Sequence, residues 1–196
     1  MDCDSKNKLK IGFNFWKLLP FIALFLLFLI PAYIGLRKAG LGRLISYHVA
    51  FMIFFFALWE IKILCSHCPY YAQDGWTLRC NANFGCPKFW QYNPSPMSTA
   101  EKVQLILGFA ILFVSPPATL FYIGQMNFAL LTSFGLFIFG WHLIKYHCAK
   151  CVNFSCPFNG VPKEEIDEFL QQNPIMRQAW EEAGWTKSSK KESSAK

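Results

Sequence analysis

Residues 13–36 of the chain have the sequence FNFWKLLPFIALFLLFLIPAYIGL, in which Lys17 is the one charged residue. A helix of about 20 mostly apolar residues is long enough to cross the roughly 30 Å hydrocarbon core of a bilayer. The stretch is longer than the apolar core of a secretory signal peptide, and no A-x-A cleavage pattern follows it. We therefore expect residues 13–36 to form a transmembrane helix that is retained in the protein.

Three other stretches of the chain are long and apolar enough for the same role. Hydrophobic residues make up 54% of the chain and charged residues only 16%, which is too apolar for a soluble domain of this length. The sequence therefore predicts an all-α membrane protein with four transmembrane helices, at about 13–36, 44–64, 103–123 and 126–146.

Two of the predicted helices contain residues that interrupt the apolar pattern. Glu60 and Lys62 occupy the last turn of the second helix, where long side chains can extend to the lipid headgroups. The third helix contains Ser115-Pro116-Pro117, which removes two backbone donors and should bend the helix. We expect neighbouring groups to satisfy the carbonyl oxygens that the prolines free, so that the bend serves helix packing.

Short connections order the four helices into two hairpins. Residues 37–43 join the first pair and residues 123–127 join the second pair. The remaining segments must then lie at the opposite membrane face, together with all eight cysteines of the chain. The predicted order is an N-terminal tail (1–12), a first transmembrane hairpin (13–64), a Cys-rich, mostly irregular loop (65–101), a second transmembrane hairpin (102–146), a Cys-rich tail with amphipathic helices (147–186) and a disordered end (187–196).

Basic residues predict which side of the membrane carries the cysteines. Near the helix ends, the side with the short turns has only Arg37, Lys38 and Arg43. The cysteine side has Lys6, Lys8, Lys10, Lys62, Arg79, Lys88, Lys102, Lys145 and Lys150. By the positive-inside rule, both termini and the Cys-rich segments are expected in the cytoplasm. The net charge of +7 needs no nucleic-acid partner, because the basic residues lie where anionic lipid headgroups attract them.

The cysteines form two clusters with the spacing of metal ligands. The first cluster is Cys65-x2-Cys68-x11-Cys80-x5-Cys86, and the second is Cys148-x2-Cys151-x4-Cys156 with His147 directly before it. A C-x-x-C turn brings two thiolates toward one metal ion. Stable disulfides are rare in a reducing cytoplasm. The predicted metal ligands are therefore Cys65, Cys68, Cys80, Cys86, Cys148, Cys151, Cys156 and His147.

Two groupings of these ligands are consistent with the sequence. In the first, each cluster binds its own ion, and His147 completes the second cluster. In the alternative grouping, the two C-x-x-C pairs form one shared site that joins the hairpins. The remaining thiols of Cys80, Cys86 and Cys156, with His147 or His67, then form the other site.

The second and fourth predicted helices end in similar patterns. Residues 59–68 have the sequence WEIKILCSHC and residues 141–151 have the sequence WHLIKYHCAKC. In both, a Lys lies three residues before a C-x-x-C that begins as the helix leaves the bilayer. The pattern is consistent with duplication of a unit composed of one hairpin and one cysteine pair, although Trp and Lys are common at membrane interfaces.

Three of the cysteines, Cys68, Cys86 and Cys156, are each followed by Pro. This arrangement resembles the last ligand of the bacterial ferredoxin motif C-x2-C-x2-C-x3-C-P. The similarity covers roughly fifteen residues. The run from Cys148 to Cys156 lacks the middle cysteine, and its last gap is four residues rather than three. The resemblance implies a ligand role and favours an iron–sulfur cluster as the cofactor, without implying a ferredoxin fold.

The predicted function is electron transfer through one or two iron–sulfur centres, between a soluble donor and a carrier or complex in the bilayer. One alternative is a structural zinc-binding scaffold or assembly protein, because zinc would order a long loop that lacks a core. The other is a membrane thiol–disulfide oxidoreductase, in which Lys62 or Lys145 would lower the pKa of a nearby thiol. Motifs for nucleotide binding, a nucleophilic serine or a zinc protease are absent from the sequence.

The tail beyond the second cluster predicts two short amphipathic helices. Pro162 can open the first, with Glu164 and Glu165 in its first turn. Asn173-Pro174 can cap and open the second, and Gly184 can end it. We expect the pair either to fold back on the Cys-rich loop or to lie on the lipid surface.

Overall fold

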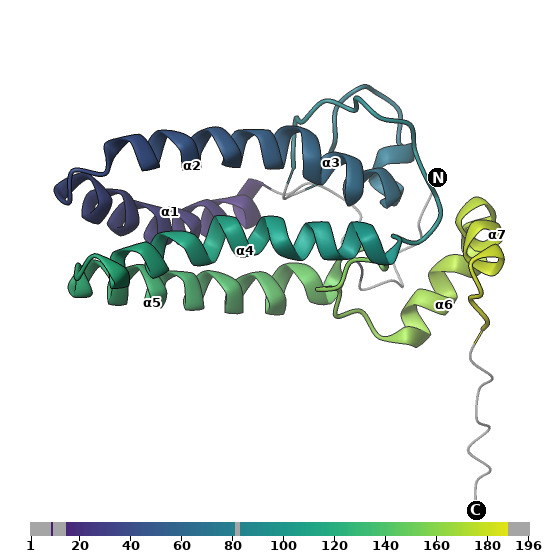
Figure 1. Ribbon diagram of the computed structural model, residues 1–196. Helices are drawn as coiled ribbons and strands as arrows, with labels where there is room; N and C mark the ends of the chain where they lie inside the picture. The colour runs from purple at the N-terminus through teal and green to yellow at the C-terminus, as the bar shows by residue number, and fades with distance from the viewer. Residues whose placement is uncertain (1–8, 10–14, 81–82, 188–196) are drawn as a thin grey trace, which may run out of the picture.

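Figure 1 shows the computed structural model of the chain, which describes Leu9 and residues 15–80 and 83–187. The rest of the predicted N-terminal tail, with Cys3, lies outside the described residues, as does the predicted disordered end beyond Lys187. Four helices are long and apolar enough to cross a membrane, at Leu18–Lys38, Gly42–His67, Thr99–Tyr122 and Met126–Lys150. The predicted all-α membrane fold is therefore confirmed.

Only α1 (Phe15–Lys38) and α4 (Thr99–Tyr122) are regular α-helices over their whole spans. The second span begins as α2 (Gly42–Phe54), widens into a π turn at Phe55–Trp59 and ends in α3 (Glu60–Ile63). The fourth span begins as α5 (Met126–His142) and widens into a π turn at Leu143–His147. Both irregular spans thus widen on the side that leads to a C-x-x-C pair, and such π turns are frequent at functional sites.

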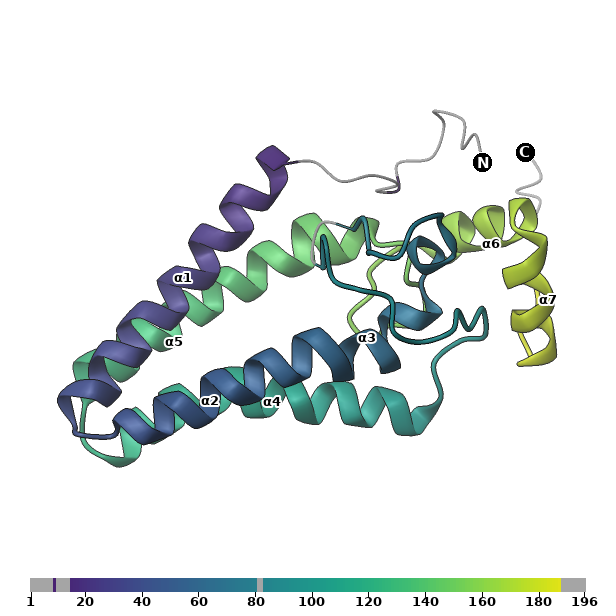
Figure 2. The ribbon, with the colours of Figure 1, turned by 90° about the horizontal axis from the view of Figure 1, so that it is seen from above.

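The four spans form a V rather than a parallel bundle. In Figure 2, α1 and α5 lie on one side and α2 and α4 on the other, and the two sides diverge from the end that carries the short turns. α5 packs against α1 and also against α4. In Figures 1 and 2 the Cys-rich segments lie at the wide end of the V, near α3 and the end of α5. Segments that are far apart in the sequence therefore meet at this end.

The narrow end of the V is closed by two turns of the same type. Gly40 and Gly124 both have a φ of +76°, which an L side chain rarely adopts. Leu41 donates its N–H to the Leu36 carbonyl oxygen at 2.9 Å, and the residue after Gly124 repeats this bond. These are glycine-ended helix caps, and the predicted short turns are present. Side chains of Leu36, Leu120 and Ala129 pack together just beneath them.

The carbonyl oxygen that Pro116 frees has a specific hydrogen-bond partner. Pro116 has no N–H, so the Leu112 carbonyl oxygen four residues earlier lacks its helical donor. His48 of α2 donates from Nε2 to this oxygen at 2.9 Å, while Tyr33 of α1 donates its hydroxyl to His48 Nδ1 at 2.8 Å. One buried imidazole therefore joins three helices and satisfies one of the two carbonyl oxygens that the prolines free.

The middle of the V is filled by aromatic rings that come from different helices. The rings of Phe28, Phe113 and Phe139 lie in one group, with centroids 5.7 and 5.8 Å apart along the series. The Phe55 ring lies so close to Gly108 that a Cβ at this position would overlap it. Glycine at this position therefore allows α4 to approach the start of the π turn.

The cap at the wide end contains little regular structure. Short 3₁₀ turns cover Cys65–His67, Pro69–Ala72 and Cys148–Lys150. A single antiparallel bridge pairs Thr77 with Pro87. The tail ends in α6 (Lys163–Gln172) and α7 (Pro174–Glu182), and both predicted amphipathic helices are present.

The two tail helices fold back on the Cys-rich segments. Asn173 accepts a hydrogen bond from the Met176 N–H at the start of α7, as predicted for a capping residue. Phe169 of α6 and Met176 of α7 are buried in one apolar cluster with Cys68 and Phe154. Of the two predicted locations for the helix pair, packing on the Cys-rich segments is the observed one.

Candidate functional site

The two C-x-x-C pairs adopt the same local structure. Cys68 donates its N–H to the Cys65 carbonyl oxygen at 3.0 Å, and Cys151 bonds Cys148 in the same way at 3.3 Å. The residues just before the two turns have φ and ψ of −116° and −57° at Leu64 and of −111° and −56° at His147. The second and fourth spans therefore end in the same backbone geometry as well as in similar sequences.

A further repeat follows each pair and was missed by the sequence analysis above. Residues 83–87 have the sequence NFGCP and residues 153–157 have the sequence NFSCP. Cys86 donates its N–H to the Asn83 carbonyl oxygen and Cys156 to the Asn153 carbonyl oxygen, both at 3.3 Å. The signal that could have found the asparagines is the shared N-F-x-C-P pattern itself.

Four thiols from the two clusters lie close enough to influence one another. Burial raises the pKa of Cys68 well above its usual range, and the neighbouring charges of Cys151, Cys80 and Cys156 raise it further. Burial also raises the pKa of Cys156 to about 12, with further contributions from Cys151 and Cys148. We call Cys68, Cys80, Cys151 and Cys156 the central thiols. They come from both clusters, as in the alternative grouping, but these four residues match neither predicted set.

Backbone N–H groups point at several of these sulfurs. The Asn83 N–H donates to Cys80 Sγ at 3.2 Å. The N–H of Tyr70 bonds Cys68, and the N–H of Phe158 bonds Cys156, in each case two residues after the cysteine. The intervening Pro has no N–H and fixes the turn that allows this contact.

Cys86 differs from the other cysteines that precede a proline. The N–H two residues further on, at Lys88, donates to the Trp76 carbonyl oxygen at 2.8 Å. Burial raises the pKa of Cys86, and the next contribution comes from the Glu60 carboxylate rather than from a thiol. Cys86 is therefore set apart from the central thiols.

Glu60 lies beneath the cap, and the prediction that its side chain reaches the headgroups is wrong. The residue is only 6% exposed. Asn83 Nδ2 donates to Glu60 Oε2 at 3.2 Å and to Cys65 Sγ at 3.1 Å. The reason for the error is that the Cys-rich loop folds back over α3 and covers the carboxylate, which the helical pattern alone could not indicate.

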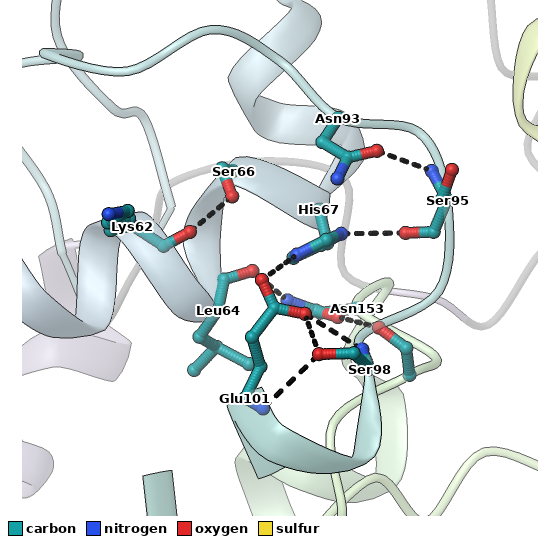
Figure 3. Close-up of polar contacts among 10 residues, drawn as sticks. Lys62, Leu64, Ser66, His67, Asn93, Ser95, Ser98, Glu101 and Asn153 are labelled. Atoms are coloured by element: carbon teal, nitrogen blue, oxygen red, sulfur yellow. Dashed lines mark hydrogen bonds and ion pairs between the residues drawn. The ribbon is translucent and has the colours of Figure 1, made fainter. Parts of the chain in front are cut away.

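The two histidines named as ligands have different surroundings. The His147 ring lies 5.5 Å from the Phe21 ring of α1 and 5.5 Å from the His142 ring. His67 is buried, and its Nδ1 and Nε2 face the Ser95 carbonyl oxygen at 2.7 Å and Glu101 Oε1 at 3.2 Å (Figure 3). Both ring nitrogens of His67 therefore have hydrogen-bond partners, and neither is available to a metal in this arrangement.

Asn153 connects the second cluster to the end of the first hairpin. Its Nδ2 donates to the Leu64 carbonyl oxygen at 2.7 Å, and its Oδ1 accepts from the Ser155 hydroxyl at 3.2 Å (Figure 3). The side chain is buried, so the sequon Asn153-Phe154-Ser155 has a structural role in the folded protein. The bond to Leu64 fixes the second cluster beside the turn that begins at Cys65.

Aromatic side chains and the tail helices shield the central thiols from water. Phe154 contacts Phe169 of α6 and Trp180 of α7, with ring centroids 5.1 and 6.4 Å apart. The pKa of Tyr92 is raised to about 12, by burial and then by the charge of Cys68. The thiols thus lie in a largely apolar setting between loop and tail.

The described cysteines are present as thiols, with no disulfide among them. In the described part of the chain, no three His, Cys, Asp or Glu side chains are already arranged around a common metal position. Buried thiols with raised pKa values are weak nucleophiles at neutral pH. A bound cation would reverse this situation, since it favours the thiolate form and releases protons.

Comparison of the chain with protein-family models, with curated proteins and with solved structures found no match.

Proposed function

We propose that the central thiols bind an iron–sulfur cluster and that the protein transfers electrons at the surface of the membrane. The observation that carries the proposal is the gathering of Cys68 and Cys80 from one segment with Cys151 and Cys156 from another. Four thiolates are the usual ligand set of such a cluster. The site lies directly at the ends of two membrane spans, where a soluble donor and a carrier in the bilayer can both approach.

Electrostatics support a cation as the occupant. Each of the thiols of Cys80, Cys151 and Cys156 makes ionisation of Cys68 less favourable. A cationic centre removes this penalty, because it stabilises all the thiolates at once. Backbone N–H groups donate to Cys68, Cys80 and Cys156. In the bound form these hydrogen bonds would help to set the reduction potential, since hydrogen bonds to ligand sulfurs tune the potential of a cluster.

The predicted ligands outside the central four are Cys65, Cys86, Cys148 and His147. Cys65 lies close to Cys68 and Cys80, and Cys148 lies close to Cys156. Cys65 and Cys148 therefore flank the central site, and a second centre would draw its ligands from them. Iron and sulfide content per chain distinguishes one cluster from two.

A structural zinc ion is the second candidate, supported by the irregular cap. The described residues between Ala72 and Ser98 contain one β-bridge and no helix. A closed tetrahedral zinc site would fix such a loop to the tail and make the protein a scaffold. The thiol–disulfide alternative is less well supported, because that chemistry needs an accessible thiol of low pKa and both Cys68 and Cys156 have raised values.

The positive-inside rule supports a cytoplasmic location for the cap and both termini. This side is reducing, which suits unprotected thiolate ligands. Labelling of intact cells with a membrane-impermeant maleimide tests the orientation. The cap thiols should react only after the membrane is made permeable.

The decisive experiment is anaerobic purification of the full chain in mild detergent, followed by a visible absorption spectrum and by iron, sulfide and zinc analysis. A brown protein with matched iron and sulfide is expected, and bleaching by dithionite would report reduction. Colourless protein that carries zinc would overturn electron transfer in favour of the scaffold. Metal-free protein with paired cysteines would overturn both.

Two serine substitutions make the test specific for the central thiols. Cys68→Ser is expected to abolish the cluster absorption, because the charges of the other three thiols all act on Cys68. Cys86→Ser is the matched control, since Cys86 also precedes a proline but faces Glu60. Equal loss in the two variants would contradict the assignment of the central four.

A further inference from the structure

The Cys-rich loop exposes several large aromatic side chains outside the membrane spans. Trp76 is 74% exposed, Phe89 is 58% exposed and Trp90 is 40% exposed. Contiguous exposed apolar surface of this kind marks an interaction site in most proteins. Tryptophan is also the residue most typical of the lipid headgroup layer, because its ring is apolar and its N–H is polar.

A short hairpin fixes these side chains on one platform. Lys88 donates its N–H to the Trp76 carbonyl oxygen and Leu78 donates to the Cys86 carbonyl oxygen, both at 2.8 Å. Leu78 is fully buried and packs with Ile61 of α3. The inner side of the hairpin is therefore attached to the end of the second span, while the aromatic residues remain outside.

Basic side chains accompany the exposed rings. The Lys62 ammonium lies 4.9 Å from the ring centroid of the exposed Trp90. Lys88 is partly exposed, and its ammonium donates to the Gln73 carbonyl oxygen and lies 5.8 Å from the ring centroid of Tyr71, which is buried. Arg79 is exposed in the same hairpin, and Asp74 is the one acidic residue between Ala72 and Ser98. This combination of aromatic and cationic groups complements an anionic, amphipathic surface.

The same combination occurs on the lipid-facing side of the second hairpin. The Lys145 ammonium lies 5.8 Å from the Trp141 ring centroid and 5.6 Å from the Tyr146 ring centroid, and both rings are exposed. These residues end a membrane span and form an aromatic belt of the usual kind. Figures 1 and 2 show the Cys-rich loop running back alongside α3 at this end of the V. Both groups of aromatic and basic residues therefore lie at the wide end of the V.

We propose that the face formed by Trp76, Phe89, Trp90, Lys62, Arg79 and Lys88 lies in the headgroup layer and binds anionic phospholipids. The thiol site then lies at the depth of the headgroups instead of projecting into the cytoplasm. The inference rests on exposure, charge and position, and it stands whether or not the thiols bind metal.

The test uses the full chain with 5-fluorotryptophan in place of tryptophan, reconstituted into vesicles. Trp76→Phe and Trp90→Phe assign the two resonances. A nitroxide attached to the lipid headgroup is expected to broaden both, and a soluble gadolinium chelate is expected to leave them sharp. Trp141 is the positive control because it lies in a span. Trp185 is the negative control because its indole N–H bonds Asp167 in the tail helices.

Lipid composition tests the charge part of the proposal. Broadening at Trp76 should be stronger in vesicles of equal parts phosphatidylcholine and phosphatidylglycerol than in phosphatidylcholine alone. The double variant Arg79→Gln, Lys88→Gln should lose this difference. No dependence on phosphatidylglycerol would overturn anionic recognition. Broadening of Trp76 and Trp90 by the chelate alone would overturn the membrane location and assign the face to water or to a protein partner.

Discussion

The two ends of the V are joined by different kinds of interaction. At the narrow end, two glycine-ended caps connect the helices, and apolar side chains such as Leu36 and Leu120 pack beneath them. At the wide end, the helices diverge and polar or sulfur groups connect the segments. Asn153 bonds the Leu64 carbonyl oxygen there, and Asn83 bonds both Glu60 and Cys65.

This difference indicates that the two ends depend on different factors for stability. The helix cap of each hairpin and the apolar packing between the two hairpins need no ligand. The wide end brings together groups from the loop, the tail and two spans, and its central thiols disfavour one another's ionisation. A ligand that binds only the assembled cap would stabilise the wide end and leave the narrow end unchanged.

Removal of the proposed metal is expected to have the largest effect, and only at the wide end. Structural metal sites of this type contribute about 10 kcal/mol in small zinc domains. After treatment with a strong chelator, amide hydrogens in residues 65–92 and 148–161 should exchange much faster, while those in α1 and α4 should not change. Hydrogen exchange read by mass spectrometry makes the comparison. Uniform loss of protection along the chain would mean that the two ends are not independent.

Metal affinity should rise steeply with pH. Each ligand thiol must lose a proton to bind, and the pKa of Cys156 in the metal-free protein is raised to about 12. Cys156 is therefore protonated before binding at neutral pH, and affinity should increase about tenfold per pH unit for each protonated thiol that binding ionises. Competition with a zinc chelator between neutral and mildly alkaline pH measures this slope.

A variant separates this effect from a general response to pH. Cys156→Ser should lower the slope of log affinity against pH by about one proton. Cys86→Ser is the control and should leave the slope unchanged. An equal change in both would show that ionisation of the central thiols does not govern binding.

The narrow end and the tail were accessible to sequence analysis because their signals are local. Long apolar runs predict the spans, and Asn173-Pro174 predicts the start of α7 within a few residues. The sequence predicted that a neighbouring group would satisfy the Leu112 carbonyl oxygen, but it did not identify that group. A proline shows which oxygen is freed and does not show which helix approaches it. His48 becomes that partner only when α2 packs against α4.

The contacts at the wide end could not be predicted, because they join residues that are far apart in the sequence. Asn153 and Leu64 are separated by 89 positions, and nothing in their own neighbourhoods indicates the bond. The burial of Glu60 has the same origin. The two N-F-x-C-P motifs were visible in the sequence, but their meaning depends on the folded cap, where Asn83 and Asn153 make different side-chain contacts from equivalent backbone positions.

A substitution in the middle of the V tests whether helix packing acts separately from the cap. Gly108→Leu places a side chain against the Phe55 ring and should destabilise the protein by about 1–3 kcal/mol. Gly140→Leu is the matched control, because a Cβ at Gly140 meets no atom within 4 Å. Unfolding in detergent with added denaturant measures both. In Gly108→Leu the proposed cluster absorption should survive until the helices separate, and its early loss would couple the cap to the core.

The smallest effect is expected for the His48 contact, and a double-mutant cycle isolates it. His48→Leu leaves the Leu112 carbonyl oxygen unsatisfied and should cost about 1 kcal/mol, as is usual for hydrogen bonds between membrane helices. Pro116→Ala restores an N–H at the position that normally bonds this oxygen, so the cost of His48→Leu should be smaller when residue 116 is alanine. The same unfolding assay gives the four stabilities of the cycle. A cost that is equal in both backgrounds would mean that His48 acts through packing alone, and that the proline bend needs no partner from α2.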